Sequence, residues 1–209
     1  MAGSASERLI RDAVVARARE LMPDARIIHE LVVGWCRADV AAVEPDRVTL
    51  FEIKSEKDTL DRLEKQASTF VKSSHQAVFV LHEKWFANRE WMTGEIYAGK
   101  TWRFPEPDRT NRWISNVWDL PPPTLKQPAP RVLLDLMWRA EMVVEAIWHG
   151  VRADRRMNME RIKDEMVWAM TGRQITEAVC RQLRARAFPE ADPPIFEKAA
   201  ETTFKEATS

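Results

Sequence analysis

The chain has 209 residues, and its 32 Lys and Arg residues are balanced by 32 Asp and Glu residues, so the formal net charge is zero. Hydrophobic residues make up 45% and charged residues 31% of the chain, which is close to globular averages and argues against a disordered protein. The zero net charge argues against a histone-like protein that binds nucleic acid by bulk charge, although it leaves room for a local basic cleft.

Cysteine usage and hydropathy indicate where the protein resides. The two cysteines, Cys36 and Cys180, are too few for a disulfide framework and favour a reducing compartment. No apolar segment approaches the ~18 residues of a membrane helix, and the first ten residues lack the apolar stretch of a signal peptide. We therefore expect a cytoplasmic protein with no membrane partner.

The first part of the chain predicts one helix followed by three strands. Apolar residues recur at helical intervals from Leu9 to Leu21. The runs 26–33, 38–43 and 48–53 have the composition of β-strands and are joined by short, turn-rich connections. Such connections favour an antiparallel meander.

A second helix and a fourth strand follow. Residues 58–73 return to helical periodicity, with Asp58 or Thr59 as the expected N-cap. Residues 76–81 predict a buried strand, and a short helix is expected near 85–92. A right-handed crossover through the second helix places its two flanking strands parallel in one sheet. The order α-β-β-β-α-β therefore predicts an α/β core with a mixed sheet.

The rest of the chain is predicted to be helical after a proline-rich connection. Seven prolines lie between residues 105 and 130, which excludes a long helix or a central strand there and favours a semi-rigid linker. Helical patterns then cover 131–148, 158–170 and 174–187, with Asn158 as a cap. We predict a core (1–104), a linker (105–130), an all-α subdomain (131–188) and a polar, frayed tail (189–209).

Two carboxylates and a lysine are expected to meet at one end of the predicted meander. Glu52 and Lys54 are two residues apart, so they leave the same face of their strand, and a tight turn brings Asp39 beside them. Such a site of hard oxygen ligands suits Mg²⁺ or Mn²⁺. The backbone carbonyl of Ile53 is a further candidate ligand, and Gln66 on the following helix can reach the same cleft.

This set of residues can cleave a phosphodiester. A divalent cation held by Asp39 and Glu52 can polarise a phosphodiester oxygen and lower the pKa of a bound water. Lys54 can orient that water or neutralise the charge that builds on the phosphorane oxygens. A Glu-x-Lys triplet alone is also typical of a solvated strand end. An Asp at the start of an apolar strand is disfavoured in a sheet, however, which favours a functional role for Asp39.

The segments 37–39 (Arg-Ala-Asp) and 52–55 (Glu-Ile-Lys-Ser), with Gln66 on the following helix, resemble the PD-(D/E)xK nuclease superfamily. The resemblance is strongest to small bacterial and phage members with an RAD…EIKS signature, including the MmcB-like DNA-repair nucleases. It covers about residues 7–82. Ala38 stands where the motif has proline, which leaves the carboxylate chemistry intact.

The resemblance implies a restriction-endonuclease-like core that cleaves phosphodiesters. It implies that Asp39 and Glu52 bind the metal and that Lys54 is catalytic. Glu30, on the first strand, lies where some relatives place an additional acidic residue. We therefore predict a Mg²⁺- or Mn²⁺-dependent deoxyribonuclease of repair, recombination or phage defence. The sequence does not decide between DNA and RNA as substrate or between a monomer and a homodimer. The alternative function is a non-catalytic module that binds nucleic acid or protein.

Several further residues are candidates for nucleic-acid contact. Arg37 and Ser55 flank the motif, and the Ser55 hydroxyl either contacts phosphate or caps the loop that follows. Arg181 and Arg184 could follow a phosphate backbone, or they could complement the dipole of the last predicted helix. The last two predicted helices have helix-turn-helix proportions, which any helical hairpin shares.

Other residue types point to chemistry less clearly. The four histidines have no ligand spacing that indicates zinc. Among the nine tryptophans, Trp85, Trp91 and Trp102 could stack on bases, although tryptophan more often anchors a core or an interface.

Overall fold

The computed structural model describes residues 5–82, 93–97, 100–104, 127–154 and 156–196. The predicted short helix near 85–92 and most of the proline-rich linker lie outside these residues. None of the helices in the described ranges is long and apolar enough to cross a membrane. The order of elements confirms the predicted α/β fold, with an N-terminal α-β-β-β-α-β unit followed by a helical region.

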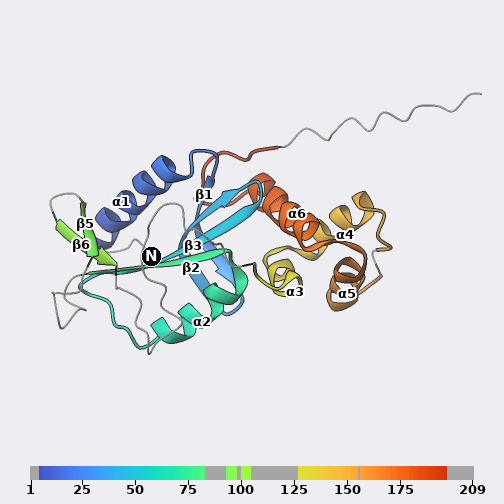
Figure 1. Cartoon of the computed structure of the whole chain (residues 1–209), viewed down its shortest axis with the longest axis horizontal. Helices are drawn as coiled ribbons and strands as arrows, with labels where there is room; N and C mark the ends of the chain where they lie inside the picture. The colour runs from blue at the N-terminus through green and yellow to red at the C-terminus, as the bar shows by residue number, and fades with distance from the viewer. Residues whose placement is uncertain (1–4, 83–92, 98–99, 105–126, 155, 197–209) are drawn as a thin grey trace, which may run out of the picture.

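One mixed sheet forms the centre of the molecule (Figure 1). Its strand order is β1-β2-β3-β4-β6-β5. β3 and β4 pair in parallel, as the crossover predicts, and the other neighbours pair antiparallel. The strands are β1 (Arg26–Val33), β2 (Cys36–Glu44), β3 (Arg47–Lys54), β4 (Gln76–His82), β5 (Thr93–Tyr97) and β6 (Lys100–Phe104).

The β5–β6 hairpin extends the sheet beyond the four predicted strands. Its two strands are short and rich in polar residues, so the apolar alternation that marks a strand in sequence is weak there. It joins the sheet through the pairing of β6 with the end of β4.

Helices α1 (Ala5–Leu21) and α2 (Leu63–Ser73) cover opposite faces of the sheet (Figure 1). α1 belongs to a core cluster with β1 to β4, whereas α2 packs into a second cluster that includes the helical region. α2 begins at Leu63 and not at the predicted Asp58 or Thr59. The reason is local: the Asp58 carboxylate accepts hydrogen bonds from the amide and the hydroxyl of Ser55 and so caps the preceding loop.

The helical region contains one more break than the sequence predicts. The predicted helix 131–148 is interrupted at Met137, which is extended, and the next helix begins with a capping hydrogen bond from the Trp138 amide to the Glu141 carboxylate. The predicted cap at Asn158 is confirmed, because its side chain accepts from the Arg161 amide. The elements are α3 (Pro130–Leu133), the 3₁₀ turn η2 (Leu134–Leu136), α4 (Arg139–Trp148), α5 (Met159–Ala169) and α6 (Gly172–Ala185).

The helical region shares its core with the sheet. Ile175, Val179 and Leu183 of α6 are fully buried in the same cluster as Leu50 and Phe79 of the central strands. α6 therefore lies directly against the sheet, with α4 and α5 farther out (Figure 1). The sequence boundary that we placed between core and helical subdomain does not separate two cores.

Residues 189–196 are not the frayed tail that the sequence predicts. Ala191 bridges Ile28, the Glu190 carbonyl accepts from the His29 amide at 3.0 Å, and an Asp192 carboxylate oxygen accepts from the Ile27 amide at 3.0 Å. The prediction fails because β1 is an edge strand whose outer amides need acceptors, and this polar segment supplies them.

A buried arginine joins the sheet to the end of α6. Arg26 on β1 is 1% exposed. Its guanidinium donates to the carbonyls of Leu183, Arg184 and Arg186 at 2.9, 2.8 and 2.6 Å, and also to the Asp192 carbonyl. The last carbonyls of a helix lack partners within the helix, so Arg26 acts as the C-terminal cap of α6.

We expect Arg26→Met to lower the free energy of unfolding by about 3 kcal/mol or more, because each buried carbonyl left without a donor costs roughly 1–3 kcal/mol. Urea denaturation followed by circular dichroism measures the change. Arg161→Met is the control, since exposed Arg161 only approaches Glu165 at 4.0 Å and its loss should cost less than about 0.5 kcal/mol. Equal effects of the two substitutions would contradict the capping role.

Candidate active site

The β1–β2 hairpin is distorted at the position of Asp39. Asp39 lies opposite Glu30 in register, but the two are not paired, and Glu30 has a φ of 57°. This left-handed conformation costs a residue other than glycine roughly 1–2 kcal/mol. The alternation of sides also breaks here, because Ile28 and Leu31, three residues apart, enter the same core cluster. Asp39 therefore lies at the point where the alternation of side chains between the two faces of the sheet shifts by one residue.

The β2 and β3 strands separate next to this distortion. Their ladder ends at the pair Val40 and Phe51. Beyond it, a carboxylate oxygen of Asp39 accepts a hydrogen bond from the Ile53 amide at 2.6 Å. The carboxylate thus replaces the backbone acceptor of a regular ladder. Since the amide and carbonyl of one strand residue point to the same side, the Ile53 carbonyl faces the same gap.

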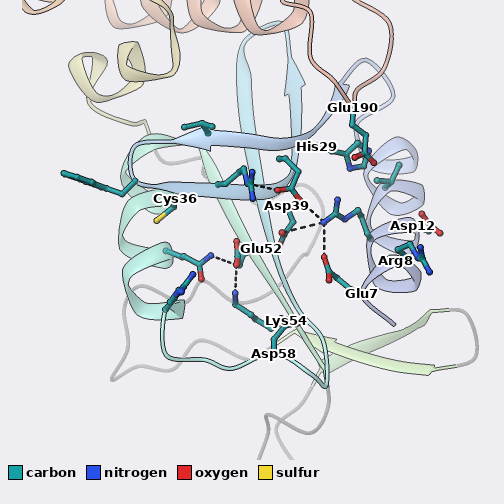
Figure 2. Close-up of a pocket in the computed structure, with 18 of the residues that line it drawn as sticks. Glu7, Arg8, Asp12, His29, Cys36, Asp39, Glu52, Lys54, Asp58 and Glu190 are labelled. Carbon is teal, nitrogen blue, oxygen red and sulfur yellow. Dashed lines mark hydrogen bonds and ion pairs between the residues drawn. The ribbon is translucent and has the colours of Figure 1, made fainter. Parts of the chain in front are cut away.

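Glu52 lies beside this gap and is 2% exposed. Its Oε1 accepts from the Lys54 ammonium at 2.6 Å and from the Gln66 amide on α2. Its Oε2 and the Gln66 Oε1 are buried and have no hydrogen-bond partner in the part of the chain that the structure describes. The structure therefore brings Asp39, Glu52, Lys54 and Gln66 into one cleft, as the sequence predicts (Figure 2).

Two buried carboxylates of like charge make this cleft electrostatically costly without a cation. Burial, and then the charge of Glu52, raise the pKa of Asp39 to about 7, against the opposing effects of the Ile53 amide, Arg11 and Lys54. Burial also raises the pKa of Glu52, although Lys54 and Gln66 oppose it. A divalent cation between the carboxylates would offset both effects.

The donor set fits a magnesium-type ion. Within the described ranges no three His, Cys, Asp or Glu side chains form a metal cluster by themselves. The site instead offers two carboxylates, the Ile53 carbonyl and the unpartnered Gln66 oxygen, all of them oxygen donors. Mg²⁺ and Mn²⁺ prefer oxygen and keep several waters when one or two carboxylates hold them.

Arg11 on α1 is a site residue that the sequence analysis missed. It donates to Glu7 at 3.1 Å and to Glu30 at 3.0 Å, and it lies 3.8 Å from Asp39. Glu30 is thereby connected to the Asp39 carboxylate through one guanidinium. Arg11 follows Ile10 on the buried face of α1, but helical spacing does not say which strand that face meets.

Arg37 remains a candidate for contact with nucleic acid, because its side chain is exposed in the cleft. Its side chain is 64% exposed, lines the cleft and pairs with the Glu30 carboxylate at 2.7 Å. Glu30 thus accepts from cations on two elements, Arg11 on α1 and Arg37 on β2.

Ser55 does not have the exposed hydroxyl that a phosphate contact needs. It is 1% exposed, its hydroxyl donates to Asp58 at 2.6 Å, and the same oxygen accepts from the Lys57 amide. The second alternative, a cap of the following loop, accounts for these bonds.

Arg181 and Arg184 make internal contacts, which do not favour the predicted role of these two residues in nucleic-acid binding. Arg181 donates twice to the buried Glu145, at 3.1 and 2.8 Å, and stacks over the Trp148 ring. Arg184 is 7% exposed and donates to the carbonyls of Asp24 and Val43. The physical reason is the position of α6, whose apolar face packs on the sheet and draws its arginines inward.

A cleft of about 1660 Å³ surrounds the site, between α1, the β1–β2 hairpin and α2 (Figure 2). Acidic side chains gather at its centre. The exposed side chains of its lining carry both signs: Asp12 and Glu190 are acidic, whereas Arg8, Arg62 and Lys65 are cations that have no side-chain partner among the described residues. These three cations are candidates for contact with phosphate.

The sequence matches the model of the family described as bacteriophage P4 protein cII over residues 2–93, the segment that carries the site. No curated protein matches it. A solved protein of unknown function from Silicibacter pomeroyi has 14% sequence identity and a TM-score of 0.40, covering 75% of this chain and 100% of its own. That likeness is too distant to carry an argument.

We expect Asp39→Asn to stabilise the fold in metal-free buffer at pH 8, by on the order of 1–3 kcal/mol. With a folded pKa of about 7 against an unfolded value of 3.8, the folded state binds more protons, so the stability of the natural protein falls as pH rises from about 4 to about 7. The variant lacks this loss. Chemical denaturation at several pH values measures it.

The matched control is Asp12→Asn, at an exposed acid of α1 on the same cleft. Its stability should follow the pH profile of the natural protein. Parallel profiles for Asp39→Asn and the natural protein between pH 5 and pH 8 would show that Asp39 is not an unfavourably buried carboxylate.

Proposed function

We propose that this protein is a metal-dependent nuclease that hydrolyses phosphodiester bonds in DNA. The observation that carries the proposal is the pair of carboxylates at the point where β2 and β3 separate, the buried Glu52 and the partly buried Asp39, with Lys54 at 2.6 Å from Glu52. The α-β-β-β-α-β order around this set agrees with the resemblance to PD-(D/E)xK nucleases.

The residues that would hold the ion are Asp39, Glu52 and the backbone carbonyl of Ile53. A bound Mg²⁺ or Mn²⁺ would polarise a phosphodiester oxygen and lower the pKa of the attacking water. The chain's own contribution is a rigid frame: the Ile53 amide fixes one oxygen of Asp39, and Lys54 and Gln66 fix one oxygen of Glu52. The second oxygen of Glu52 is left without a partner.

Lys54 is the residue for electrostatic stabilisation and for orienting water. It extends from the same face of β3 as Glu52, and its side chain is only 12% exposed. A buried ammonium interacts strongly with negative charge, because little water screens it. It can donate to a water or to an oxygen of the phosphodiester while the carboxylate of Glu52 keeps it in place.

Arg11 and Glu30 support Asp39 from the other side of the gap. The guanidinium favours the charged form of Asp39 and opposes the effect of burial on its pKa. Glu30 in turn holds Arg11 at 3.0 Å. We assign both as positioning residues, since Arg11 acts through Asp39 and Glu30 acts through Arg11.

DNA is the proposed substrate because exposed cations, Arg8, Arg62 and Lys65, line the cleft that holds the carboxylates and can contact the phosphates that flank one metal-bound phosphodiester. RNA would require the same metal chemistry. A panel of single-stranded, double-stranded and branched DNA beside RNA distinguishes the two.

We expect Lys54→Ala and Asp39→Ala each to lower the rate of Mg²⁺-dependent DNA cleavage by about 10²-fold or more, because each removes charge stabilisation of the reaction. Gel-based cleavage of labelled DNA measures the rates. Lys57→Ala is the control, since Lys57 is exposed three residues along the chain and lies outside the cleft lining. Full activity in either site variant would remove this mechanism.

A measurement of metal binding distinguishes the nuclease from the non-catalytic alternative. The natural protein should bind Mn²⁺ in calorimetry, and Asp39→Ala should abolish that binding. A natural protein that neither binds Mn²⁺ nor cleaves any member of the panel would favour the alternative of a binding module.

A further inference from the structure

The tip of the β1–β2 hairpin presents a tryptophan to solvent. Val33 and Cys36 pair across the hairpin, so its loop consists of Gly34 and Trp35 alone. Gly34 has a φ of 59°, as the tight two-residue turns of hairpins require. Trp35 is 90% exposed. Nothing in the sequence analysis had singled it out.

This tip has a fixed position beside the cleft. A Cβ atom on Gly34 would lie 3.7 Å from the Thr69 side chain on α2, so the turn is in van der Waals reach of that helix. The neighbouring Cys36 thiol also faces the Thr69 hydroxyl, at 3.9 Å. The exposed indole therefore stands on a supported turn.

Trp35 and the metal-site carboxylate line the same cleft. Trp35 and Asp39 are four positions apart in the chain, a path of roughly 13 Å at ~3.3 Å per strand residue. The cross-strand pair of Val32 and Arg37, both 64% exposed, lies between them. That length corresponds to about four nucleotides at ~3.4 Å per base step, and to fewer in a stretched strand.

The surroundings of the indole match what single strands bind. Aromatic side chains stack on unpaired bases with little sequence preference, and basic residues beside them follow the backbone. The cleft has both, because Arg62, just before α2, and Lys65 on α2 are exposed and have no side-chain partner among the described residues. In an intact duplex the base faces cover one another, so only a terminal pair could use such a platform.

We propose that Trp35 is a base-stacking platform for an unpaired nucleotide, and that the substrate class is DNA with a single-stranded stretch next to the cleaved phosphodiester. This inference rests on the proposed function. It assigns the metal site to cleavage and the hairpin tip to selecting strands whose bases are free.

The test measures equilibrium binding in EDTA, where no cleavage occurs, by fluorescence anisotropy of a labelled oligo(dT) and of a long blunt duplex, in which terminal base pairs are few compared with internal ones. Stacking on one base contributes about 1–3 kcal/mol, so Trp35→Ala should weaken oligo(dT) binding about 5- to 100-fold. Binding of the blunt duplex should change less than about 2-fold. Trp35→Phe should retain most of the affinity, because it keeps an aromatic face.

Trp168 provides the matched control. It is 89% exposed on α5 and does not line the cleft, so Trp168→Ala should leave both affinities within about 2-fold. A direct readout is photo-crosslinking of 5-iododeoxyuridine in the oligonucleotide, which should attach to Trp35 in a peptide identified by mass spectrometry. Circular dichroism verifies that each variant is folded.

Unchanged oligo(dT) binding by Trp35→Ala would overturn the inference, and so would an equal loss for oligo(dT) and blunt duplex. Cleavage assays on the same proteins keep the two proposals apart. Cleavage by the natural protein with binding that ignores Trp35 removes the platform and keeps the nuclease. Single-strand binding that depends on Trp35, without cleavage in Mg²⁺, removes the nuclease and keeps the platform.

Discussion

The hydrogen bond from the Ile53 amide to the Asp39 carboxylate is the contact on which the site depends. It occurs where two neighbouring strands stop pairing, and it supplies the acceptor that the missing strand contact would have given. A buried amide without an acceptor would be costly, so the separation of the strands and the position of the carboxylate stabilise each other. This bond holds the Asp39 carboxylate at the end of the β2–β3 ladder, next to the residue that precedes Ile53 on β3, Glu52.

The site concentrates several unfavourable features in a small volume. Glu30 adopts a left-handed backbone, the buried carboxylate of Glu52 lies near the partly buried one of Asp39, and oxygens of Glu52 and Gln66 lack partners among the described residues. Each feature destabilises the fold, whereas the apolar strands around it are regular and fully buried. Such local conflicts between residue and environment are typical of positions kept for binding or chemistry. A cation would offset the repulsion between the Asp39 and Glu52 carboxylates, and a bound substrate would meet side chains that are already positioned.

Much of this arrangement follows from local rules that sequence alone provides. Alternation along a strand and short connections predicted the four central strands and the convergence of Asp39 with Glu52. Long-range packing was not accessible: helical spacing places Arg11 on the margin of a buried face but does not name the strand opposite. Arg184 looked like a surface cation because its internal acceptors lie on segments more than a hundred residues away. Trp35 was not predicted as a site residue, although a large side chain in a two-residue hairpin turn is expected to be exposed to solvent.

The contact of residues 190–192 with β1 has a consequence for the newly made chain. The outer edge of β1 is closed by a segment that the ribosome adds about 160 residues later, so this edge stays open during most of synthesis. Open strand edges invite pairing with other chains. α1 can pack on the nascent sheet early. α6 cannot, because the carbonyls that Arg26 caps belong to residues 183 and 184, which are made much later. The edge of β1 is therefore completed only after a segment made about 160 residues later folds back onto it.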